Sequence, residues 1–210
     1  MSDRKRLAIF GASGHGKVVA DIALLSGWQE IDFYDDAWPE KKTLAHWILK
    51  GAFIDLIKVL DSYDGVIVAI GNNAIRETMT VKIKTLQGRL ATLIHPQAIV
   101  SPFANIEEGV VVVGGAVINA FATLGLGCIV NTGATVGHDC HISSCVHIAP
   151  GANVAGNVTI GRNCWVGVGA AIRQGIQLQE NVVVGAGAAV VQDVECGQTV
   201  IGVPARSVSQ

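Results

Sequence analysis

The sequence has few charged residues, few aromatic residues and no long uninterrupted apolar stretch. Charged side chains make up 15% of its 210 residues and aromatic ones 5%, whereas 50% are hydrophobic. A formal net charge of −2 provides no general attraction to nucleic acid or to an anionic membrane surface. The apolar residues come in groups shorter than the ~18 consecutive residues typical of a membrane-spanning helix. The composition therefore predicts a compact protein without nucleic-acid or membrane partners.

A secretory signal and a disulfide framework are also not predicted. The first residues, MSDRKRLAIFGASG, pass through a short apolar run directly into a glycine turn, whereas a signal peptide needs a longer apolar core. Five cysteines are an odd number, and the repeat described below places Cys128, Cys140 and Cys164 inside the fold as small apolar groups. We therefore expect a cytoplasmic protein with reduced thiols.

The most informative feature is a six-residue repeat that runs from Val100 to Glu195 without interruption. It contains sixteen blocks, each of which begins with Val, Ile or Leu and has Ala, Cys, Val or Ile at its fifth position. This period fits neither an α-helix nor an alternating strand, and it is typical of a parallel β-helix with a narrow packed interior. The first residues of the blocks are Val100, Ile106, Val112, Ile118, Leu124, Val130, Val136, Ile142, Ile148, Val154, Ile160, Val166, Ile172, Leu178, Val184 and Val190.

Before about residue 97, short apolar strands alternate with helical stretches. Strands are predicted over 7–10, 31–34, 65–70 and 90–94, and helices over 17–26, 55–60 and 73–86. The stretch 37–52 is predicted to be a surface loop, with a lid over a ligand as the alternative. Alternating strands and helices indicate a small parallel sheet with helices on both faces. We therefore predict a Rossmann-like α/β domain over residues 1–97 and a β-helix domain over 98–210.

A glycine-rich turn, Gly11-Ala-Ser-Gly-His-Gly-Lys17, separates the first predicted strand from the first predicted helix. Glycines at this place let the backbone approach a phosphate, and the helix N-terminus favours its charge. Val18 stands where a P-loop needs Ser or Thr, and the glycine spacing differs from the dinucleotide motif GxGxxG. A nucleotide ligand is therefore favoured over an NTPase or an NAD-dependent enzyme, and a turn needed only for strand–helix packing is the alternative.

Three loops of this domain are predicted to meet at the carboxyl edge of the sheet, where open α/β sheets bind ligands. They carry Gly14-His15, the acidic pair Asp35-Asp36 and Gly71-Asn72. Asp35 stands 24 residues after Gly11, where nucleotide-binding proteins place an acid on a ribose hydroxyl. For Asn72, capping of the following helix is an alternative role. The convergence of these loops predicts a nucleotide pocket.

A second cluster, His138-Asp139-Cys140-His141 with His147 close behind, has the residue types of a zinc site. With three blocks per coil, a residue's neighbours on adjacent coils lie 18 positions away, so Thr123 and Thr159 flank His141. No second histidine stacks on any of these histidines, and Cys140 faces inward. A metal site within one chain is therefore not expected.

His138 is better suited to proton transfer. It stands at the third position of its block, outside the predicted interior, and Gly156 on the next coil leaves room beside it. A neutral histidine can take a proton from an incoming nucleophile, and Asp139 can hold its tautomer and stabilise the imidazolium. A surface histidine without a chemical role is the alternative.

The repeat, the His138-Asp139-Cys140 triplet and the ending Gly202-Val-Pro-Ala-Arg206 resemble the left-handed β-helix acyltransferases of the hexapeptide-repeat family. The whole chain is similar to the branch that includes nucleotide-sugar amine N-acetyltransferases and sialic-acid O-acetyltransferase-like proteins. The glycine turn, Asp35-Asp36, Ile70-Gly-Asn-Asn73 with Arg76, and Leu93-Ile-His-Pro96 follow in the same order. The resemblance implies a left-handed coil and a homotrimer with acetyl-CoA between the β-helices of adjacent subunits.

The resemblance also implies roles for individual residues. His138 matches the general base and Asp139 its acidic partner. His147 matches a contact to the thioester end of the acetyl donor, Gly156 matches a backbone contact to the same group, and Asn131 lines the acceptor site. The residues that match the nucleotide-sugar pocket are Gly14, His15, Asp35, Asp36 and Gly71.

The implied reaction is direct acetyl transfer from acetyl-CoA to the amine of a UDP- or dTDP-linked 4-amino-4,6-dideoxy sugar, for the synthesis of a surface polysaccharide or glycan. No metal is expected, and an acyl-cysteine route is a minor alternative because Cys140 faces inward and Cys145 lacks a base. Two further alternatives are O-acetylation of a sialic acid or related sugar, with a CMP-linked acceptor, and a non-catalytic sugar-nucleotide-binding protein.

Overall fold

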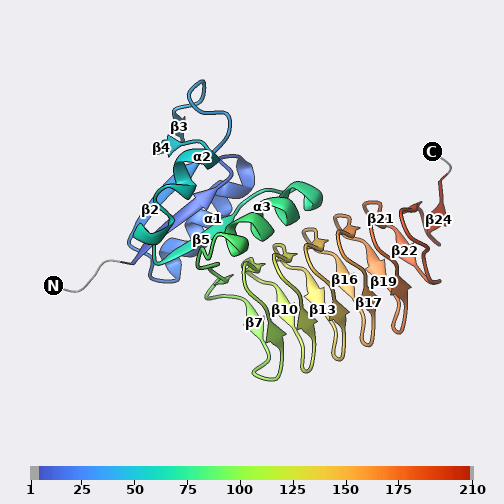
Figure 1. Cartoon of the computed structure of the whole chain (residues 1–210). Coiled ribbons are helices and arrows are strands. Elements are labelled where there is room, and N and C mark those ends of the chain that lie inside the picture. Colours follow the sequence, from blue (N-terminus) through green and yellow to red (C-terminus); the bar gives the residue numbers. More distant parts are fainter. Residues whose placement is uncertain (1–4, 209–210) are drawn as a thin grey trace. The chain divides into compact units, whose positions relative to one another are not determined.

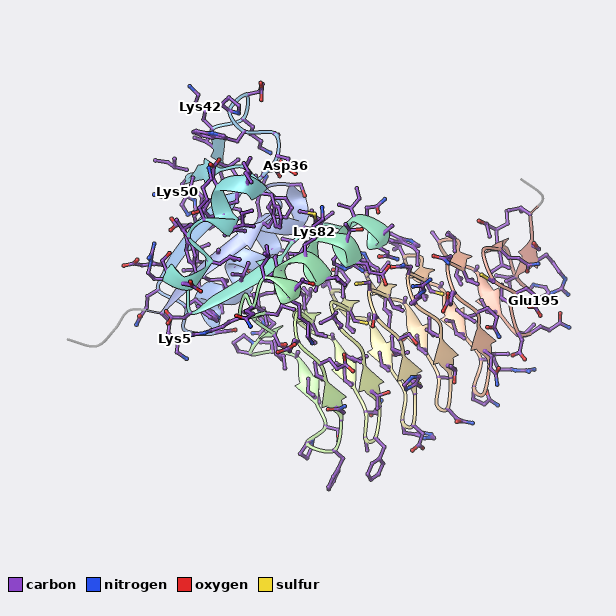
Figure 2. The ribbon with its side chains drawn as sticks, in the orientation of Figure 1. Lys5, Asp36, Lys42, Lys50, Lys82 and Glu195 are labelled. Atoms are coloured by element: carbon purple, nitrogen blue, oxygen red, sulfur yellow. The ribbon has the colours of Figure 1, made fainter. Side chains whose placement is uncertain are left out.

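The computed structural model describes residues 5–208 and divides after Pro96 into two compact units (Figure 1). No helix among the described residues is long and apolar enough to cross a membrane. Charged side chains such as Lys5, Lys42 and Lys50 in the first unit and Glu195 in the second are exposed (Figure 2).

The first unit has a five-stranded sheet in the order β3-β4-β2-β1-β5. β1 pairs in parallel with β2 and β5, β4 pairs in parallel with β2, and only β3 is antiparallel to its neighbour. This topology confirms the predicted α/β class. The elements are β1 (Arg6–Phe10), α1 (Gly14–Leu25), β2 (Glu30–Tyr34), β3 (Thr43–Leu44), β4 (Trp47–Gly51), α2 (Phe53–Ile57), a 3₁₀ helix (Leu60–Ser62), β5 (Gly65–Val68), α3 (Asn73–Thr85) and β6 (Leu93–Ile94).

Continuous apolar runs form the centre of this sheet because both of its faces are covered. Leu7 to Phe10 of β1 and Val66 to Val68 of β5 are buried along their whole length, as expected of parallel strands inside an α/β layer. In α1, Val19, Ala20 and Ala23 are buried. The core of the unit therefore lies directly behind the carboxyl ends of β1, β2 and β5.

The prediction of a surface loop over 37–52 is wrong for residues 43–51. This segment forms the β3–β4 hairpin, in which Ala45 adopts a left-handed conformation with a φ of 50°, and β4 extends the sheet beside β2. Leu44 and Leu49 point into the core, whereas Ile48 and Lys50 are exposed. The alternation of buried and exposed residues covers only five positions, which is too short to stand out from an irregular sequence.

The second unit is a parallel β-helix in which every six-residue block supplies one short strand. β7, β10, β13, β16, β19 and β22 form one sheet, β8, β11, β14, β17 and β20 a second, and β9, β12, β15, β18, β21, β23 and β24 belong to a third. The strands are β7 (Ile99–Val100), β8 (Asn105–Ile106), β9 (Val111–Val112), β10 (Val117–Ile118), β11 (Thr123–Leu124), β12 (Ile129–Val130), β13 (Thr135–Val136), β14 (His141–Ile142), β15 (His147–Ile148), β16 (Asn153–Val154), β17 (Thr159–Ile160), β18 (Trp165–Val166), β19 (Ala171–Ile172), β20 (Gln177–Leu178), β21 (Val183–Val184), β22 (Ala189–Val190), β23 (Thr199–Ile201) and β24 (Arg206–Ser207).

The register confirms the predicted stacking of residues 18 positions apart. His141 pairs with Thr123 on one side and with Thr159 on the other, and His147 pairs with Ile129 and Trp165. The first and fifth residues of the blocks fill the interior as one continuous apolar cluster. Each residue on a face therefore has known neighbours on the coils before and after it.

The predicted inward cysteines lie in this interior. Cys140 and Cys164 are buried, and each thiol donates a hydrogen bond to a backbone carbonyl, that of Ala155 and that of Gln179 respectively. Burial raises the pKa of the Cys140 thiol and raises the pKa of Cys164 to about 11. Thiolate formation is disfavoured at both sites, which argues against an acyl-cysteine at Cys140.

Adjacent residues of β21 test how much the interior contributes to stability. Val184 is fully buried, whereas its neighbour Val183 is 39% exposed. Val184→Ala removes two buried carbon atoms and leaves a cavity, so we expect it to lower the free energy of unfolding by about 2 kcal/mol. Val183→Ala, the matched control, is expected to cost about 0.5 kcal/mol or less. Urea unfolding followed by circular dichroism measures both, and equal losses would contradict the assigned register.

Candidate active site

His138 and Asp139 lie at a corner of the coil, in the turn between β13 and β14. His138 Nδ1 and Asp139 Oδ2 are 2.7 Å apart, and the two side chains are 68% and 56% exposed. Asp139 adopts a left-handed conformation with a φ of 57°, and its N–H donates to the carbonyl of Ala120 on the preceding coil. Because a carboxylate only accepts hydrogen bonds, it favours the proton on Nδ1 and leaves the lone pair on Nε2.

The imidazole of His138 lies against Gly156 on the following coil. A Cβ atom placed on Gly156 would come within 2.5 Å of His138 Nε2 and 2.7 Å of Cε1, far inside contact distance. The φ of Gly156 lies outside the left-handed region, so its backbone does not itself require glycine. The missing side chain therefore makes room for the histidine ring, as the sequence predicted.

Asn131 and His147, which are sixteen residues apart, also meet. Asn131 Oδ1 accepts the N–H of Thr132 at 2.8 Å, so its Nδ2 is oriented to donate to His147 Nε2 at 3.1 Å. His147 is buried, and its ring lies against that of Trp165, with centroids 4.3 Å apart. Since Nε2 accepts this bond, His147 is held as the neutral tautomer with its proton on Nδ1.

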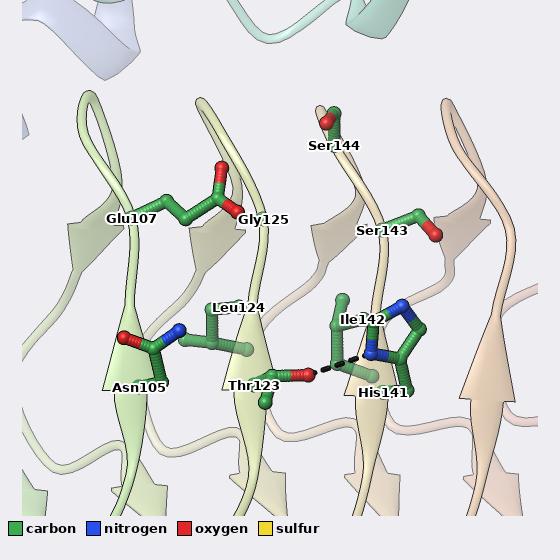
Figure 3. Close-up of a pocket in the computed structure, with 9 residues that line it drawn as sticks. All are labelled: Asn105, Glu107, Thr123, Leu124, Gly125, His141, Ile142, Ser143 and Ser144. Carbon is green, nitrogen blue, oxygen red and sulfur yellow. Dashed lines mark hydrogen bonds between the residues drawn. The ribbon is translucent and has the colours of Figure 1, made fainter.

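His141 takes part in a different interaction from its neighbour His138. Its Nδ1 is 2.8 Å from the hydroxyl of Thr123, and both residues line a polar hollow of about 160 Å³ on the face formed by β8, β11 and β14 (Figure 3). Among residues 5–208 there is no group of three His, Cys, Asp or Glu side chains placed to hold a metal ion. The His138-Asp139-Cys140-His141 segment is thus divided, with His138 at a corner of the coil and His141 on a face.

In the first unit, a hollow of about 330 Å³ lies at the carboxyl ends of β1, β2 and β5. Three predicted residues, Asp35, Asp36 and Gly71, line it. The predicted Gly14 and His15 do not line it; they lie in the first turn of α1, directly after the lining residue Ser13. The residues that line it are Phe10, Gly11, Ser13, Asp35, Asp36, Ile70, Gly71, Ile75 and Met79.

Both carboxylates of this hollow bind loop backbone. Asp35 accepts the N–H groups of Ala12 at 2.6 Å and Ala37 at 2.9 Å, and Asp36 accepts the N–H of Phe53 at the start of α2 at 2.9 Å. Lys41 donates to the carbonyl of Ala12 from the other side of the glycine turn. The structure shows that the acidic pair holds the loops around the hollow in place, a role that the sequence did not indicate. The contact to ribose that the sequence indicated stays a prediction. Each carboxylate keeps further lone pairs for a ligand.

The glycines of this region fall into two groups. A Cβ on Gly11 would lie 2.7 Å from the carbonyl of Ala69, and one on Gly16 would lie 2.4 Å from the carbonyl of Gly11. Tight packing of α1 against the turn after β1, the alternative that the sequence left open, explains Gly16. Gly11 is explained by its close approach to the loop after β5 and by its φ of 115°. At Gly14 and Gly71 a Cβ would meet nothing within 4 Å. The fold does not explain why those two positions lack a side chain, whereas a closely approaching ligand would.

Arg76 of α3 is a buried residue whose role the sequence did not indicate. Its Nη1 donates to the carbonyls of Ile70 and Gly71, and its Nη2 donates to Asn73 Oδ1. Asn72 accepts the N–H of Ile75 at 3.0 Å, which bears out its alternative role as the N-cap of α3. The guanidinium thus fixes the loop after β5. In the sequence, Arg76 stood out only as part of the resemblance, where it follows the Ile70-Gly-Asn-Asn73 turn without an assigned role.

His15 lies at the N-terminal end of α1, close enough to Arg76 for the two charges to interact. Burial first, and then the Arg76 guanidinium, lower the pKa of His15 from 6.5 to about 4. His15 is therefore neutral near pH 7. A neutral imidazole next to the hollow can donate or accept one hydrogen bond at each nitrogen.

Known proteins match both units. Residues 6–83 match the family model of the PglD N-terminal domain, and residues 157–192 match that of the hexapeptide repeat of succinyl-transferase. A structure of the acetyltransferase domain of PglB from Neisseria gonorrhoeae is 41% identical with a TM-score of 0.92, over 97% of this chain and 100% of that chain. A variant of perosamine N-acetyltransferase from Caulobacter crescentus, in complex with CoA and GDP-perosamine, is 32% identical with a TM-score of 0.92, over 97% of each chain.

A curated relative, UDP-N-acetylbacillosamine N-acetyltransferase from Bacillus subtilis, is 36% identical over 111 residues. The match spans 51% of this chain and 51% of that protein, so the chain covers about half the length of the relative. Fold, repeat and relatives together place the chain among the hexapeptide-repeat acyltransferases. Within them, it belongs to the N-acetyltransferases of nucleotide-linked amino sugars that carry a PglD-type N-terminal domain. The resemblance and the fold class expected from the sequence are confirmed.

The environment of His15 predicts a pH dependence of stability. The folded-state pKa of about 4 lies below the unfolded value near 6.5, so the unfolded chain binds a proton that the folded chain does not as the pH falls between these values. Above pH 6.5, the titration of His15 therefore does not change the free energy of unfolding. As the pH falls from 6.5 to about 4, it lowers the free energy of unfolding progressively. Comparison of urea unfolding for wild type and His15→Asn at pH 7 and pH 5 should show the wild type losing more stability. An NMR titration midpoint of His15 near 6.5 would contradict this assignment.

Proposed function

We propose that the protein transfers an acetyl group from acetyl-CoA to the amine of a UDP- or dTDP-linked 4-amino-4,6-dideoxy sugar. The observation that carries the proposal is the His138–Asp139 pair, which presents the Nε2 lone pair beside Gly156 on a β-helix corner. Support also comes from similar structures that contain acetyl coenzyme A, or CoA with GDP-perosamine. In the first unit, the hollow at the carboxyl ends of β1, β2 and β5 is the candidate site for a nucleotide.

In the proposed reaction, the neutral amine attacks the thioester carbon of acetyl-CoA. A C–N bond forms, His138 Nε2 accepts the amine proton, and Asp139 stabilises the imidazolium through Nδ1. The carbonyl oxygen becomes an oxyanion that a backbone N–H of the coil, such as that of Gly156, stabilises. The C–S bond then breaks, and the leaving CoA sulfur takes the proton back from the imidazolium. No covalent enzyme intermediate and no metal ion are needed.

The first unit holds the nucleotide in this proposal. The phosphates approach the N-terminus of α1, where Gly14 has no side chain and backbone N–H groups favour an anion. Gly71 allows an equally close approach from the loop after β5. Asp35 and Asp36 accept ribose hydroxyls with the lone pairs that their backbone bonds leave over, and His15 supplies a neutral donor or acceptor.

The remaining predicted residues belong to the coil. We propose that the active molecule is a cytoplasmic homotrimer with acetyl-CoA between adjacent β-helices. His147, locked as a neutral tautomer by Asn131, contacts the thioester end of the donor, while Asn131 borders the acceptor. The bond between the two side chains couples the positions of both substrates. Proximity in one cleft then provides much of the rate enhancement.

The acceptor is tested by the release of CoA. Acetyl-CoA is incubated with the protein and with UDP-, dTDP- or CMP-linked amino sugars, or with sialic acid, and the free thiol is measured together with the mass of the product. We expect thiol release with UDP- or dTDP-linked 4-amino sugars and an N-acetyl product. Acetylation of a sialic acid hydroxyl would replace the proposal, and no release with any acceptor would favour a binding protein.

The same assay tests the base. His138→Ala is expected to lower kcat by roughly 10²-fold or more, the range typical of lost general-base catalysis, while acetyl-CoA binding stays nearly intact. Isothermal titration with acetyl-CoA serves as the control. Turnover close to that of the wild type would remove His138 from the mechanism.

Gly156 is tested through its effect on the His138 ring. A methyl group at Gly156 displaces the imidazole, and we expect Gly156→Ala to lower kcat by about tenfold to a hundredfold, as small displacements of catalytic groups do. In a His138→Ala background the same change should cost much less, because there is no ring to displace. Equal losses of kcat in both backgrounds would show that Gly156 acts on another group.

A further inference from the structure

Lys41 places a positive charge against the glycine turn that follows β1. It lies in the segment between β2 and β3 and is partly buried, whereas the next residue, Lys42, is exposed. The Lys41 ammonium donates a hydrogen bond to the carbonyl of Ala12, and the Lys41 backbone N–H donates to the carbonyl of Ala37. Lysine side chains usually extend their ammonium into water. The charged end of Lys41 is instead directed onto the backbone of the turn.

The bond from Lys41 completes the set of contacts that hold Ala12. The N–H of Ala12 donates to Asp35 Oδ2 at 2.6 Å, and Asp35 Oδ1 accepts the N–H of Ala37 at 2.9 Å. The segment from Asp35 to Lys41 therefore binds both polar backbone groups of Ala12. Ala12 directly precedes Ser13, the N-cap of α1, whose side chain makes no capping hydrogen bond. The position of the first N–H groups of α1 thus depends on this segment.

The charges around the neighbouring hollow disfavour a nucleotide unless a cation lies near it. Asp35 and Asp36 line the hollow, and their carboxylates repel the negatively charged phosphates of a nucleotide. His15 is neutral near pH 7, because burial and then Arg76 lower its pKa to about 4. The guanidinium of Arg76 is bound to two carbonyls of the loop after β5. Lys41 supplies a further positive charge, on the side of the glycine turn.

We infer that Lys41 is a further binding residue for the acceptor, and that its ammonium attracts and holds the phosphates of the nucleotide-linked sugar at the start of α1. The inference rests on the proposed function for the identity of the hollow as a nucleotide pocket. An ammonium has three N–H donors, and the bond to Ala12 uses one of them, so two remain for phosphate oxygens. A Cβ on Gly14 would meet nothing within 4 Å, so the phosphates have room to approach.

The test is Lys41→Met, which removes the charge but keeps an unbranched side chain of similar length. Lys42→Met is the matched control, because Lys42 belongs to the same segment and is exposed (Figure 2). Lys41→Arg keeps a positive charge and several N–H donors, so it tests whether charge is the property that matters. Circular dichroism and thermal unfolding establish that the three variants are folded.

The affinities of ligands with and without phosphates are compared. Isothermal titration measures binding of UDP and dTDP, and ligand-observed NMR measures binding of uridine and thymidine, which have no phosphate. We expect Lys41→Met to weaken the tighter diphosphate about tenfold, the value of one hydrogen bond to a charged group, and to leave the nucleoside nearly unaffected. Lys42→Met should bind like the wild type, and Lys41→Arg should recover most of the lost affinity. Added salt should weaken diphosphate binding more in the wild type than in Lys41→Met.

The nucleosides distinguish a contact to phosphate from a purely structural role. Equal losses of affinity for diphosphate and nucleoside in Lys41→Met would overturn the inference, because they would show that Lys41 acts only by holding Ala12. Diphosphate affinity equal to that of the wild type would overturn it as well. The same conclusion would follow if Lys41→Arg bound the diphosphate as weakly as Lys41→Met.

These binding measurements need no acetyl-CoA, so they separate the inference from the proposed reaction. A protein that binds UDP or dTDP through Lys41 but releases no CoA with any acceptor would refute acetyl transfer and leave the role of Lys41 intact. CoA release with an acceptor KM that Lys41→Met does not raise would support the proposed function and refute the role of Lys41. A wild-type protein that binds neither diphosphate would refute the nucleotide pocket and the role of Lys41 together.

Discussion

The stacking of residues 18 positions apart is the constraint on which the candidate site depends. Successive coils lie about 4.8 Å apart, so every outward side chain has a defined neighbour above and below. This is why Gly156 decides whether the ring of His138 fits, and why the hydroxyl of Thr123 lies 2.8 Å from Nδ1 of His141. Residues that are far apart in the sequence become contacts through the register alone. A substitution on one coil therefore acts on the chemistry of the next.

Glycine has two separate uses in this chain. At Gly11 and Gly16 a side chain would collide with backbone, so Gly11 belongs to the packing of the turn against the loop after β5 and Gly16 to the packing of the first helix against that turn. At Gly14 and Gly71 the space is open, and at Gly156 it is taken by a catalytic candidate. The distinction requires coordinates, because all of these positions look alike in a glycine-rich sequence. It separates the part of the glycine motif that maintains the fold from the part that faces a ligand.

Most of the coil was predictable because one period repeats without an insertion, and each block contributes a strand at the expected place. The first unit was less predictable where the signal was short or depended on loop geometry. β4 shows only five alternating residues, and the backbone bonds of Asp35 exist only once the loops around it have formed. Side-chain hydrogen bonds and backbone strain arise from three-dimensional surroundings that periodicity does not encode.

Three histidines of the candidate binding and active sites show how the local environment gives one residue type different roles. His15 is kept neutral by burial and by Arg76, so it can form hydrogen bonds but does not take up a proton near pH 7. His147 has its Nε2 engaged by Asn131, whose own orientation is set by the N–H of Thr132. His138 combines a carboxylate on Nδ1 with an Nε2 that faces the space left by Gly156. Of the three, only His138 combines an exposed ring with a carboxylate partner that can stabilise the positive charge, as a general base requires.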